Sequence, residues 1–384
     1  MKSPKKKVLV FIDWYLPGYK AGGPIRSCAN LIEALSDQYD FWVVCRDRDY
    51  LEDKPYPGIE PNRWENRGAA KTLYLSPKNQ SLNTITEVIA TLKPDVIYIN
   101  GIFSKVFSIY PLISIRRIQS NHRIILSPRG MLAPSALGLK AFKKSVFLKL
   151  AKAMNLFRGV VFHATNQDEK EQIEKGFSGS EIIVAENIPG LPGDGKSSSR
   201  NFKAENKLKM YAVARIAPEK NIDFAISCLQ NIPKDLEVSY RIIGSKYDEA
   251  YFSKCVKMAD ALPGHVRVHF QKPLPPSELS AEAKKHDVFF LPTRGENYGH
   301  AIIEALNSGV PVLISDRTPW RALEMKELGF DLSLQKDRFT KKIIELSRMS
   351  PSNFHKKYSK VSKIAAKLVN KHEIRADYQK IFDG

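Results

Sequence analysis

Two glutamates with seven residues between them lie around a predicted helix start. An apolar run over 288–291 is followed by proline, which is typical of a buried strand. The next residues are polar and predict a loop that contains Glu296, and the helix pattern over 300–307 contains Glu304. A helix N-terminus attracts anions, and carboxylates accept hydrogen bonds from hydroxyl groups. The pattern therefore predicts a site for a ligand with phosphate and hydroxyl groups, at the carboxyl end of a parallel strand.

Two cations follow another predicted strand. Arg215 and Lys220 come after the apolar run 210–214, so both could reach a diphosphate from one side. The competing interpretation is a solvated pair with Glu219 between the two cations. Because these positions converge on the carboxyl edge of one sheet, we favour a binding site.

Gly22 and Gly23 lie between the first predicted strand and the first predicted helix. Adjacent glycines let a backbone approach a ligand closely, although simple turn chemistry is the alternative. Asp47 and Asp49 could hold a divalent metal on a nucleotide-sugar diphosphate. The neighbouring Arg48 favours ordinary surface pairing instead, and we expect no metal site.

Short apolar runs alternate with amphipathic stretches along the chain. Predicted strands cover 8–12, 41–45, 72–75, 96–99, 124–127, 160–164, 182–185, 210–214, 238–243, 266–270, 288–291 and 312–315. Predicted helices cover 25–36, 82–92, 104–119, 139–157, 166–175, 221–229, 249–261, 276–285, 300–307, 320–328 and 372–382. This alternation predicts an α/β protein whose parallel sheets are covered on both faces.

The chain of 384 residues exceeds the size at which one core keeps growing. A run of turn formers over 189–206 predicts a linker between two doubly wound, Rossmann-like domains, 1–188 and 207–366, that face one cleft. We expect the last helix, in 367–384, to pack back on the first domain.

The net charge of +19 would attract nucleic acid, anionic lipid or small anions. No aromatic–basic motif for nucleic-acid binding is visible, so we expect no nucleic-acid partner. Four scattered cysteines indicate neither a disulfide framework nor a zinc site. No apolar run approaches a membrane span or a secretory signal. A cytoplasmic protein is the expectation.

The segment 140–158 contains six basic and no acidic residues, and its apolar residues fall near one helical face. A basic amphipathic helix of this kind can lie on an anionic membrane surface, which would place the protein peripherally on the inner face of the plasma membrane. The alternative is a helix that covers the sheet while its lysines face water.

Taken together, the motifs resemble the retaining glycosyltransferases of family 4, also called group 1, which have the GT-B fold. Residues 296–299 and 304–306 reproduce the family's E-x7-E signature, and Arg215 with Lys220 looks like its phosphate pair. Further similar segments are the glycine loop at 22–24, the stretches 127–131 and 163–165, the continuation at 309–312 and 318–320, and the closing helix at 378–382.

The resemblance implies transfer of a sugar from a nucleotide donor, most simply UDP- or GDP-linked, with retention and without a metal or other cofactor. Arg215 and Lys220 would bind the diphosphate, Glu304 the ribose diol, and Glu296 the hydroxyls of the transferred sugar. The donor would also be bound by Asn297, Tyr298, Gly299, Gly244, Gly22 and Gly23.

Two positions depart from the family pattern. Arg129 stands near the place where many members have a histidine, and Asn100 stands where histidine before glycine is common. Both residues belong to the acceptor-binding first domain in this resemblance. No residue is assigned as a general base, because the leaving phosphate is thought to take the proton of the acceptor.

We therefore expect a hexosyltransferase of surface polysaccharide biosynthesis (exopolysaccharide, capsule or lipopolysaccharide) that acts on a saccharide or a lipid-linked saccharide. The alternatives are a nucleotide-sugar epimerase of the same fold, which needs no acceptor, or a basic nucleic-acid-binding protein.

Overall fold

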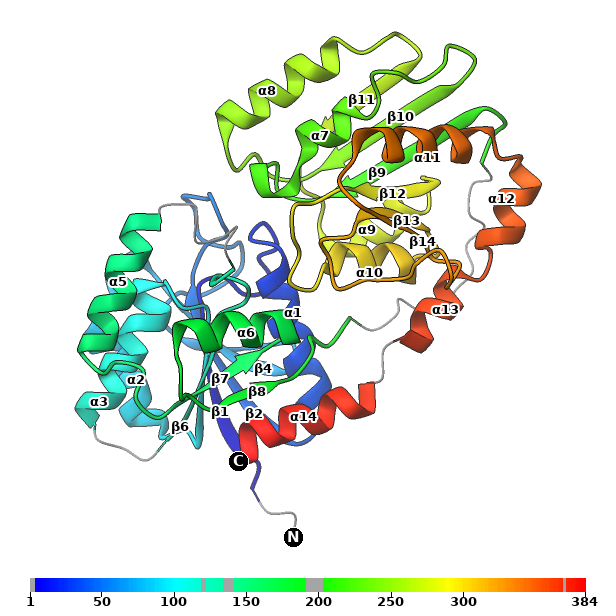
Figure 1. Ribbon diagram of the computed structural model, residues 1–384. Helices are drawn as coiled ribbons and strands as arrows, with labels where there is room; N and C mark the ends of the chain where they lie inside the picture. Colours follow the sequence, from blue (N-terminus) through cyan, green and yellow to red (C-terminus); the bar gives the residue numbers. More distant parts are fainter. Residues whose placement is uncertain (1–3, 119–121, 134–140, 191–202, 369–370) are drawn as a thin grey trace. The chain divides into compact units, whose positions relative to one another are not determined.

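The computed structural model describes residues 4–118, 122–133, 141–190, 203–368 and 371–384. The chain forms two compact units, one of residues 1–188 with 370–384 and one of residues 189–369. We call them the N-terminal unit and the C-terminal unit. Each contains one sheet flanked by helices (Figure 1). No helix among the described residues is long and apolar enough to cross a membrane.

The N-terminal unit contains a sheet with the strand order β3-β4-β2-β1-β5-β6-β7-β8, parallel except between β3 and β4. Its strands are β1 (Lys6–Ile12), β2 (Tyr39–Arg46), β3 (Trp64–Arg67), β4 (Ala70–Leu75), β5 (Val96–Asn100), β6 (Arg123–Ser127), β7 (Val160–Ala164) and β8 (Ile182–Val184). Its helices are α1 (Gly23–Leu35), α2 (Leu82–Leu92), α3 (Tyr110–Ile118), α5 (Ala141–Ala153), α6 (Gln167–Gly176) and α14 (Lys371–Asp383), with a 3₁₀ turn at Pro77–Asn79 and a π-helical turn at Lys105–Ile109.

The C-terminal unit contains a parallel sheet with the order β11-β10-β9-β12-β13-β14. Its strands are β9 (Lys207–Val213), β10 (Glu237–Ile243), β11 (Val266–Gln271), β12 (Val288–Leu291), β13 (Val312–Ser315) and β14 (Gly329–Leu332). Its helices are α7 (Ile222–Ser227), α8 (Glu249–Asp260), α9 (Pro276–Ala283), α10 (His300–Asn307), α11 (Lys336–Arg348), α12 (Pro351–Tyr358) and α13 (Val361–Leu368), with a 3₁₀ turn at Pro218–Lys220. The predicted α/β class with two Rossmann-like parallel sheets is confirmed.

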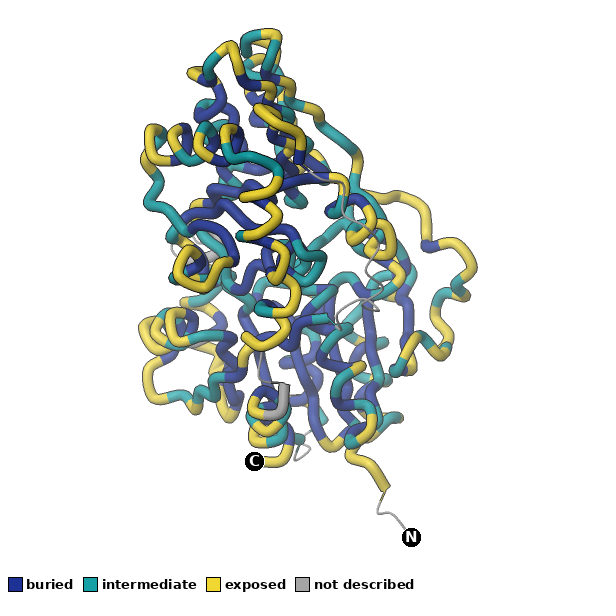
Figure 2. Tube along the Cα trace, turned by 90° about the vertical axis from the view of Figure 1, so that its right-hand side faces the viewer, coloured by how far each residue is buried: buried dark blue, intermediate teal, exposed yellow. Residues whose placement is uncertain are grey.

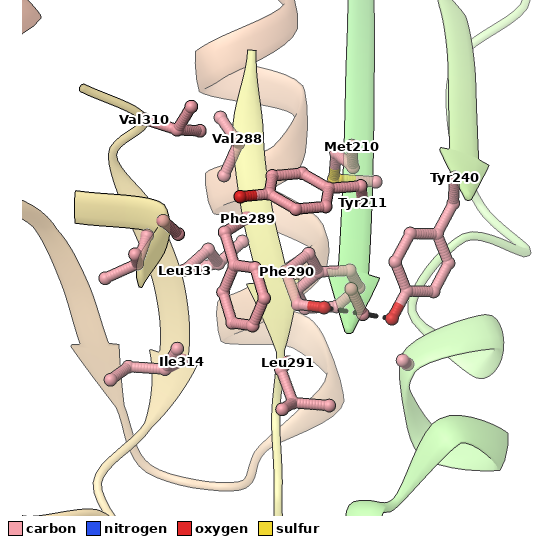
Figure 3. Packing of buried hydrophobic residues seen from close by; sticks show 14 of the residues in the cluster. Met210, Tyr211, Tyr240, Val288, Phe289, Phe290, Leu291, Val310, Leu313 and Ile314 are labelled. Carbon is pink, nitrogen blue, oxygen red and sulfur yellow. Dashed lines mark hydrogen bonds between the residues drawn. The ribbon is translucent and has the colours of Figure 1, made fainter. Parts of the chain in front are cut away.

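Each sheet is buried between its helices. Figure 2 shows the buried residues along the strands and the exposed residues along outer helix faces and loops. In the C-terminal unit all four residues of β12 are buried, and Tyr240 of β10 donates a hydrogen bond from its hydroxyl to the carbonyl of Phe290 at 2.9 Å (Figure 3). A strand that is buried on both faces needs an unbroken apolar run, which is the pattern seen at 288–291.

The last helix, α14, is part of the N-terminal unit. The ring of Phe382 lies 5.1 Å from the ring of Tyr39 on β2, centroid to centroid. Arg375 donates from Nη2 to Asp37 at 2.7 Å, and Lys6 pairs with Asp383 at 2.8 Å. These contacts tie α14 to β1, to β2 and to the turn between α1 and β2.

The predicted helix at 320–328 is wrong. The chain makes a turn there, and Ala322 and Glu327 have positive φ values of 55° and 54°. The carboxylate of Asp331 accepts hydrogen bonds from the backbone N–H groups of Ala322 and Leu323 at 3.1 and 2.8 Å. Asp331 lies on β14, which was also missing from the predicted strands, so the stabilising carboxylate comes from outside the turn.

The edge strand β3 was missing from the prediction too. Its residues alternate between exposed and half-buried positions, and it pairs only with β4, antiparallel. Because no residue of this short strand is buried, its sequence shows no alternation of apolar and polar residues from which a strand could be predicted.

Candidate functional site

The predicted donor-binding residues lie on loops after neighbouring strands of the C-terminal sheet. Strands β9, β12 and β13 are adjacent, and their loops leave from the same carboxyl edge. The chain order reverses between β9 and β12, so this edge is the topological switch point of the unit. Open parallel sheets bind ligands at such points.

Lys220 and Glu296 are brought into contact. Nζ of Lys220 lies 2.6 Å from Oε1 of Glu296, and the two side chains are only 17% and 14% exposed. The interpretation in which Glu219 bridges both cations is wrong for the lysine, because Lys220 pairs across the site with Glu296. A phosphate that binds Lys220 must compete with this carboxylate.

Arg215 keeps its guanidinium at the edge of the site. Its Nη2 lies 3.4 Å from Oε1 of Glu219, and the group stands 4.9 Å from the ring centroid of Tyr247. The arginine side chain is 35% exposed, so an exposed ion pair of this length holds it only weakly. A ligand with negative charge can therefore draw Arg215 away from Glu219.

The loops after β9 and β12 are joined by a set of hydrogen bonds. The side chain of Asn221 donates to the carbonyl of Pro292 at 3.0 Å and accepts from Nε of Arg294 at 3.0 Å. The hydroxyl of Thr293 and the backbone N–H of Arg294 both donate to the carbonyl of Glu219, at 3.1 and 3.0 Å. These bonds fix the relative positions of the loops that carry Lys220 and Glu296.

The loop after β13 joins the same arrangement. The hydroxyl of Ser315 donates to the carbonyl of Thr293 at 2.5 Å, and the backbone N–H of Glu296 donates to the carbonyl of Arg317 at 3.0 Å. Sequence reasoning missed Asn221, Thr293 and Ser315 as positioning residues. The sequence offered one signal for them. Thr293 and Ser315 each follow an apolar run, and Asn221 follows the turn after such a run.

Helix α10 begins beside this loop at Gly299. Gly299 has φ 80° and ψ 57°, and no side chain caps the helix start. This positive φ favours glycine, and a Cβ at this position would also lie 2.8 Å from Cδ1 of Ile302. Trp320 donates from Nε1 to the carbonyl of Tyr298 at 2.6 Å, which fixes the turn before the helix. The N-terminal end of a helix is suited to an anion because of its N–H groups and its dipole.

The remaining predicted residues of this unit lie at the same edge. Asn297 is half-buried in the loop, and Glu304 is half-buried within α10. Gly244 follows β10, where an added Cβ would lie 1.8 Å from the carbonyl oxygen of Ala214. The glycine is therefore required by the close approach of two backbones. This approach keeps Ile216, next to Arg215, hydrogen-bonded to Ser245 at 2.8 Å.

In the N-terminal unit, Gly22 precedes α1 with φ 81°, and a Cβ there would meet nothing within 4 Å. Asp49 accepts hydrogen bonds from the backbone N–H groups of Tyr19 and Lys20, at 2.9 and 3.2 Å. Asp47 pairs with Arg48 at 2.8 Å. Asp47 thus makes the arginine pairing that the sequence favoured, although both carboxylates are buried and Asp49 binds backbone donors instead. The described residues contain no group of three or more potential metal ligands.

Arg129 and Asn100 are brought together inside the N-terminal unit. Nε of Arg129 donates to Oδ1 of Asn100 at 2.9 Å, and Nη2 donates to the hydroxyl of Tyr98 at 2.7 Å. A third bond joins Nη1 to Asn187. Protein acceptors therefore hold the guanidinium, which suits a residue that positions its neighbours.

The hydroxyl of Tyr98 extends this network to His163. It lies 2.8 Å from Nδ1 of His163, whose Nε2 lies 2.8 Å from the carbonyl of Ala185. Since a carbonyl can only accept, Nε2 carries the proton and Nδ1 accepts from Tyr98. Burial, and then the charge of Arg129, lower the pKa of His163 to about 3. The imidazole is therefore neutral.

This lowered pKa predicts a pH dependence of stability. The unfolded imidazole has a pKa of about 6.5, so between about pH 6.5 and 3 the unfolded chain binds a proton that the folded chain does not. The contribution of His163 is complete above that interval and is lost as the pH falls through it. His163→Gln should make the free energy of unfolding fall less steeply between pH 6.5 and 4, by up to about 1.4 kcal/mol per pH unit in urea titrations. The exposed His355 supplies the control His355→Gln, and equal slopes in wild type and His163→Gln would contradict the prediction.

Two Rossmann-like parallel-sheet units, one of them with a cationic site at its switch point, define the GT-B class of glycosyltransferase folds. Residues 195–367 match the family model described as "Glycosyl transferases group 1". The fold and this match support a group 1 glycosyltransferase. The sequence resemblance is confirmed at that level, whereas membership of family 4 and the retaining mechanism stay predictions.

One curated relative and two solved structures illustrate the similarity. The chain is 25% identical over 264 residues to "Uncharacterized 41.2 kDa protein in cps region" of Klebsiella pneumoniae, covering 65% of this chain and 69% of the relative. Anabaena HepE, solved with UDP and glucose, superposes with a TM-score of 0.69 at 15% identity, over 98% of this chain and 99% of HepE. WaaG, described as a glycosyltransferase involved in lipopolysaccharide biosynthesis, has a TM-score of 0.68 at 13% identity, over 98% of this chain and all (100%) of WaaG.

Proposed function

We propose that this protein is a retaining glycosyltransferase that moves a hexose from a UDP- or GDP-linked donor to a saccharide or lipid-linked saccharide during surface polysaccharide biosynthesis. The observation that carries the proposal is the pair of Lys220 and Glu296, in the same unit as Arg215 and the start of α10. The relative from a cps region and the lipopolysaccharide role of WaaG support the pathway class. The UDP and glucose bound by HepE support a nucleotide-sugar donor.

Donor binding would separate the resting ion pair. The diphosphate would bind Lys220 and Arg215, and Glu296 would then accept hydrogen bonds from the hydroxyls of the sugar. Glu304 would accept from the ribose diol, while N–H groups at the start of α10 would face the phosphate. Negative charge that develops on the leaving diphosphate would be stabilised by these prearranged donors, so the proposal needs no metal or other cofactor.

The N-terminal unit would bind the acceptor, with Arg129 and Asn100 acting on it through the residues that they position. The leaving phosphate would take the proton of the acceptor hydroxyl, so no general base is assigned. We propose a cytoplasmic location for this reaction.

The test combines binding with product analysis. UDP or GDP should raise the thermal unfolding midpoint, because a ligand that binds only the folded state stabilises it by mass action. Transfer from the matching hexose donor should require an acceptor, persist in EDTA, and give a first product whose anomeric configuration by NMR equals that of the donor. An inverted product would contradict retention, and epimer or free sugar formed without acceptor would indicate the epimerase instead.

A further inference from the structure

Helix α5 of the N-terminal unit carries an exposed apolar stripe. Eight large hydrophobic side chains are exposed among the described residues, and three of them are Val146, Leu150 and Met154, at 39%, 60% and 70%. Spacing by four places these three side chains on one face of the helix and its end. Exposed apolar groups that gather in this way mark a contact surface for another molecule or a membrane.

The stripe is separate from the face that α5 uses to cover the sheet. Phe147 and Leu148 pack against the core of the unit, where Ala151 is only 3% exposed. The ring of Phe147 lies 5.8 Å from the ring of Phe103, centroid to centroid. The inner face therefore accounts for the sheet-covering role, and the exposed stripe needs a different explanation.

Basic residues accompany the stripe in the sequence and on a neighbouring helix. The segment 140–158 has six basic residues and no acidic residue, and Lys149 and Arg158 are exposed. Arg116, exposed at the end of α3, donates a hydrogen bond to the carbonyl of Arg158, which adds a cation from a second helix. Exposed apolar side chains beside cations complement an anionic lipid surface. The apolar groups enter the acyl boundary, and the cations contact lipid phosphate.

We propose that this face docks the N-terminal unit on an anionic membrane, with Val146, Leu150 and Met154 inserted between headgroups. A lipid-linked acceptor would then be presented to the unit that carries the docking face, a consequence that rests on the proposed function. Docking itself does not depend on that function, because no sugar or nucleotide takes part in it.

Flotation with vesicles tests the proposal. Wild-type protein should float with vesicles of phosphatidylcholine and phosphatidylglycerol but not with phosphatidylcholine alone. The double variant Leu150→Glu/Met154→Glu should bind at least about tenfold less, because it places charges where apolar groups are buried. Leu51→Glu/Met325→Glu is the matched control, since these side chains are 65% and 84% exposed elsewhere and should leave flotation unchanged.

A second comparison isolates the charge. Lys149→Glu should weaken flotation, whereas Lys341→Glu, an exposed lysine on α11, should not. Equal binding by both double variants, or no flotation of the wild type with anionic vesicles, would overturn the proposal. So would a stripe variant that abolishes a dimer in size-exclusion chromatography without changing flotation. Since no substrate is present, an error in the proposed function would leave these outcomes unaffected.

Discussion

Lys220→Ala is expected to lower kcat/KM by about 10²–10³-fold, because it removes a charge that stabilises the leaving diphosphate. It should also lower the free energy of unfolding by about 1–3 kcal/mol, since it leaves the carboxylate of Glu296 poorly hydrated and unpaired. The two side chains are 17% and 14% exposed and 2.6 Å apart, so removing the lysine changes the environment of the carboxylate. Steady-state kinetics and urea unfolding measure the two effects separately.

A double variant separates catalysis from stability. Lys220→Met/Glu296→Gln removes both charges, so it should recover much of the lost stability while activity stays low. Lys207→Ala is the control, because Lys207 pairs with Glu237 at 2.8 Å but both side chains are about half exposed or more, at 49% and 64%. That exposed pair should contribute less than about 1 kcal/mol and nothing to turnover. Wild-type kcat/KM in Lys220→Ala would show that the ion pair is only structural.

Gly244→Ala is expected to disturb the same site from the next strand. The new methyl group would lie 1.8 Å from the carbonyl oxygen of Ala214, which is backbone and cannot rotate away. The loops after β9 and β10 must then separate, at a cost of about 1–3 kcal/mol in the free energy of unfolding. Because this displaces Arg215, kcat/KM should fall by on the order of 10²-fold.

Gly264→Ala is the matched control in the same unit. Its added Cβ would meet nothing within 4 Å, and its φ is not positive. The variant should be neutral or more stable by less than about 1 kcal/mol, since alanine restricts the unfolded chain. If Gly244→Ala and Gly264→Ala have the same free energy of unfolding and the same kcat/KM, the backbone contact does not constrain Arg215.

The sequence predicted those parts of the site that depend only on the succession of strand, loop and helix along the chain. A short apolar run that is followed by Pro292 is typical of a buried strand, so the loop and the helix that come next are expected at the carboxyl edge of a sheet. This placed Glu296 and Glu304 at the carboxyl edge of a parallel strand, as the structure has them. Similar reasoning placed Lys220 in the loop that follows β9.

The pairing of side chains from distant segments could not be predicted in this way. Lys220 and Glu296 are separated by 76 positions, and nothing in either segment states that the lysine prefers this carboxylate to Glu219. The same limit explains Arg129, whose bond to Tyr98 depends on the neighbouring placement of β5 and β6. Where a residue outside a segment decides its local structure, as Asp331 does for the turn before β14, the pattern within the segment predicts the wrong element.

The place of α14 has a consequence for synthesis of the protein on the ribosome. Chains emerge from their N-terminal end, and units generally fold as they appear. The N-terminal unit, however, lacks α14 until the whole C-terminal unit has been made, so the rings of Tyr39, Phe41 and Tyr98 await Phe382. During that interval the nascent unit presents an apolar face on which a chaperone can act. The first half of the chain to be translated is thus the last to be completed.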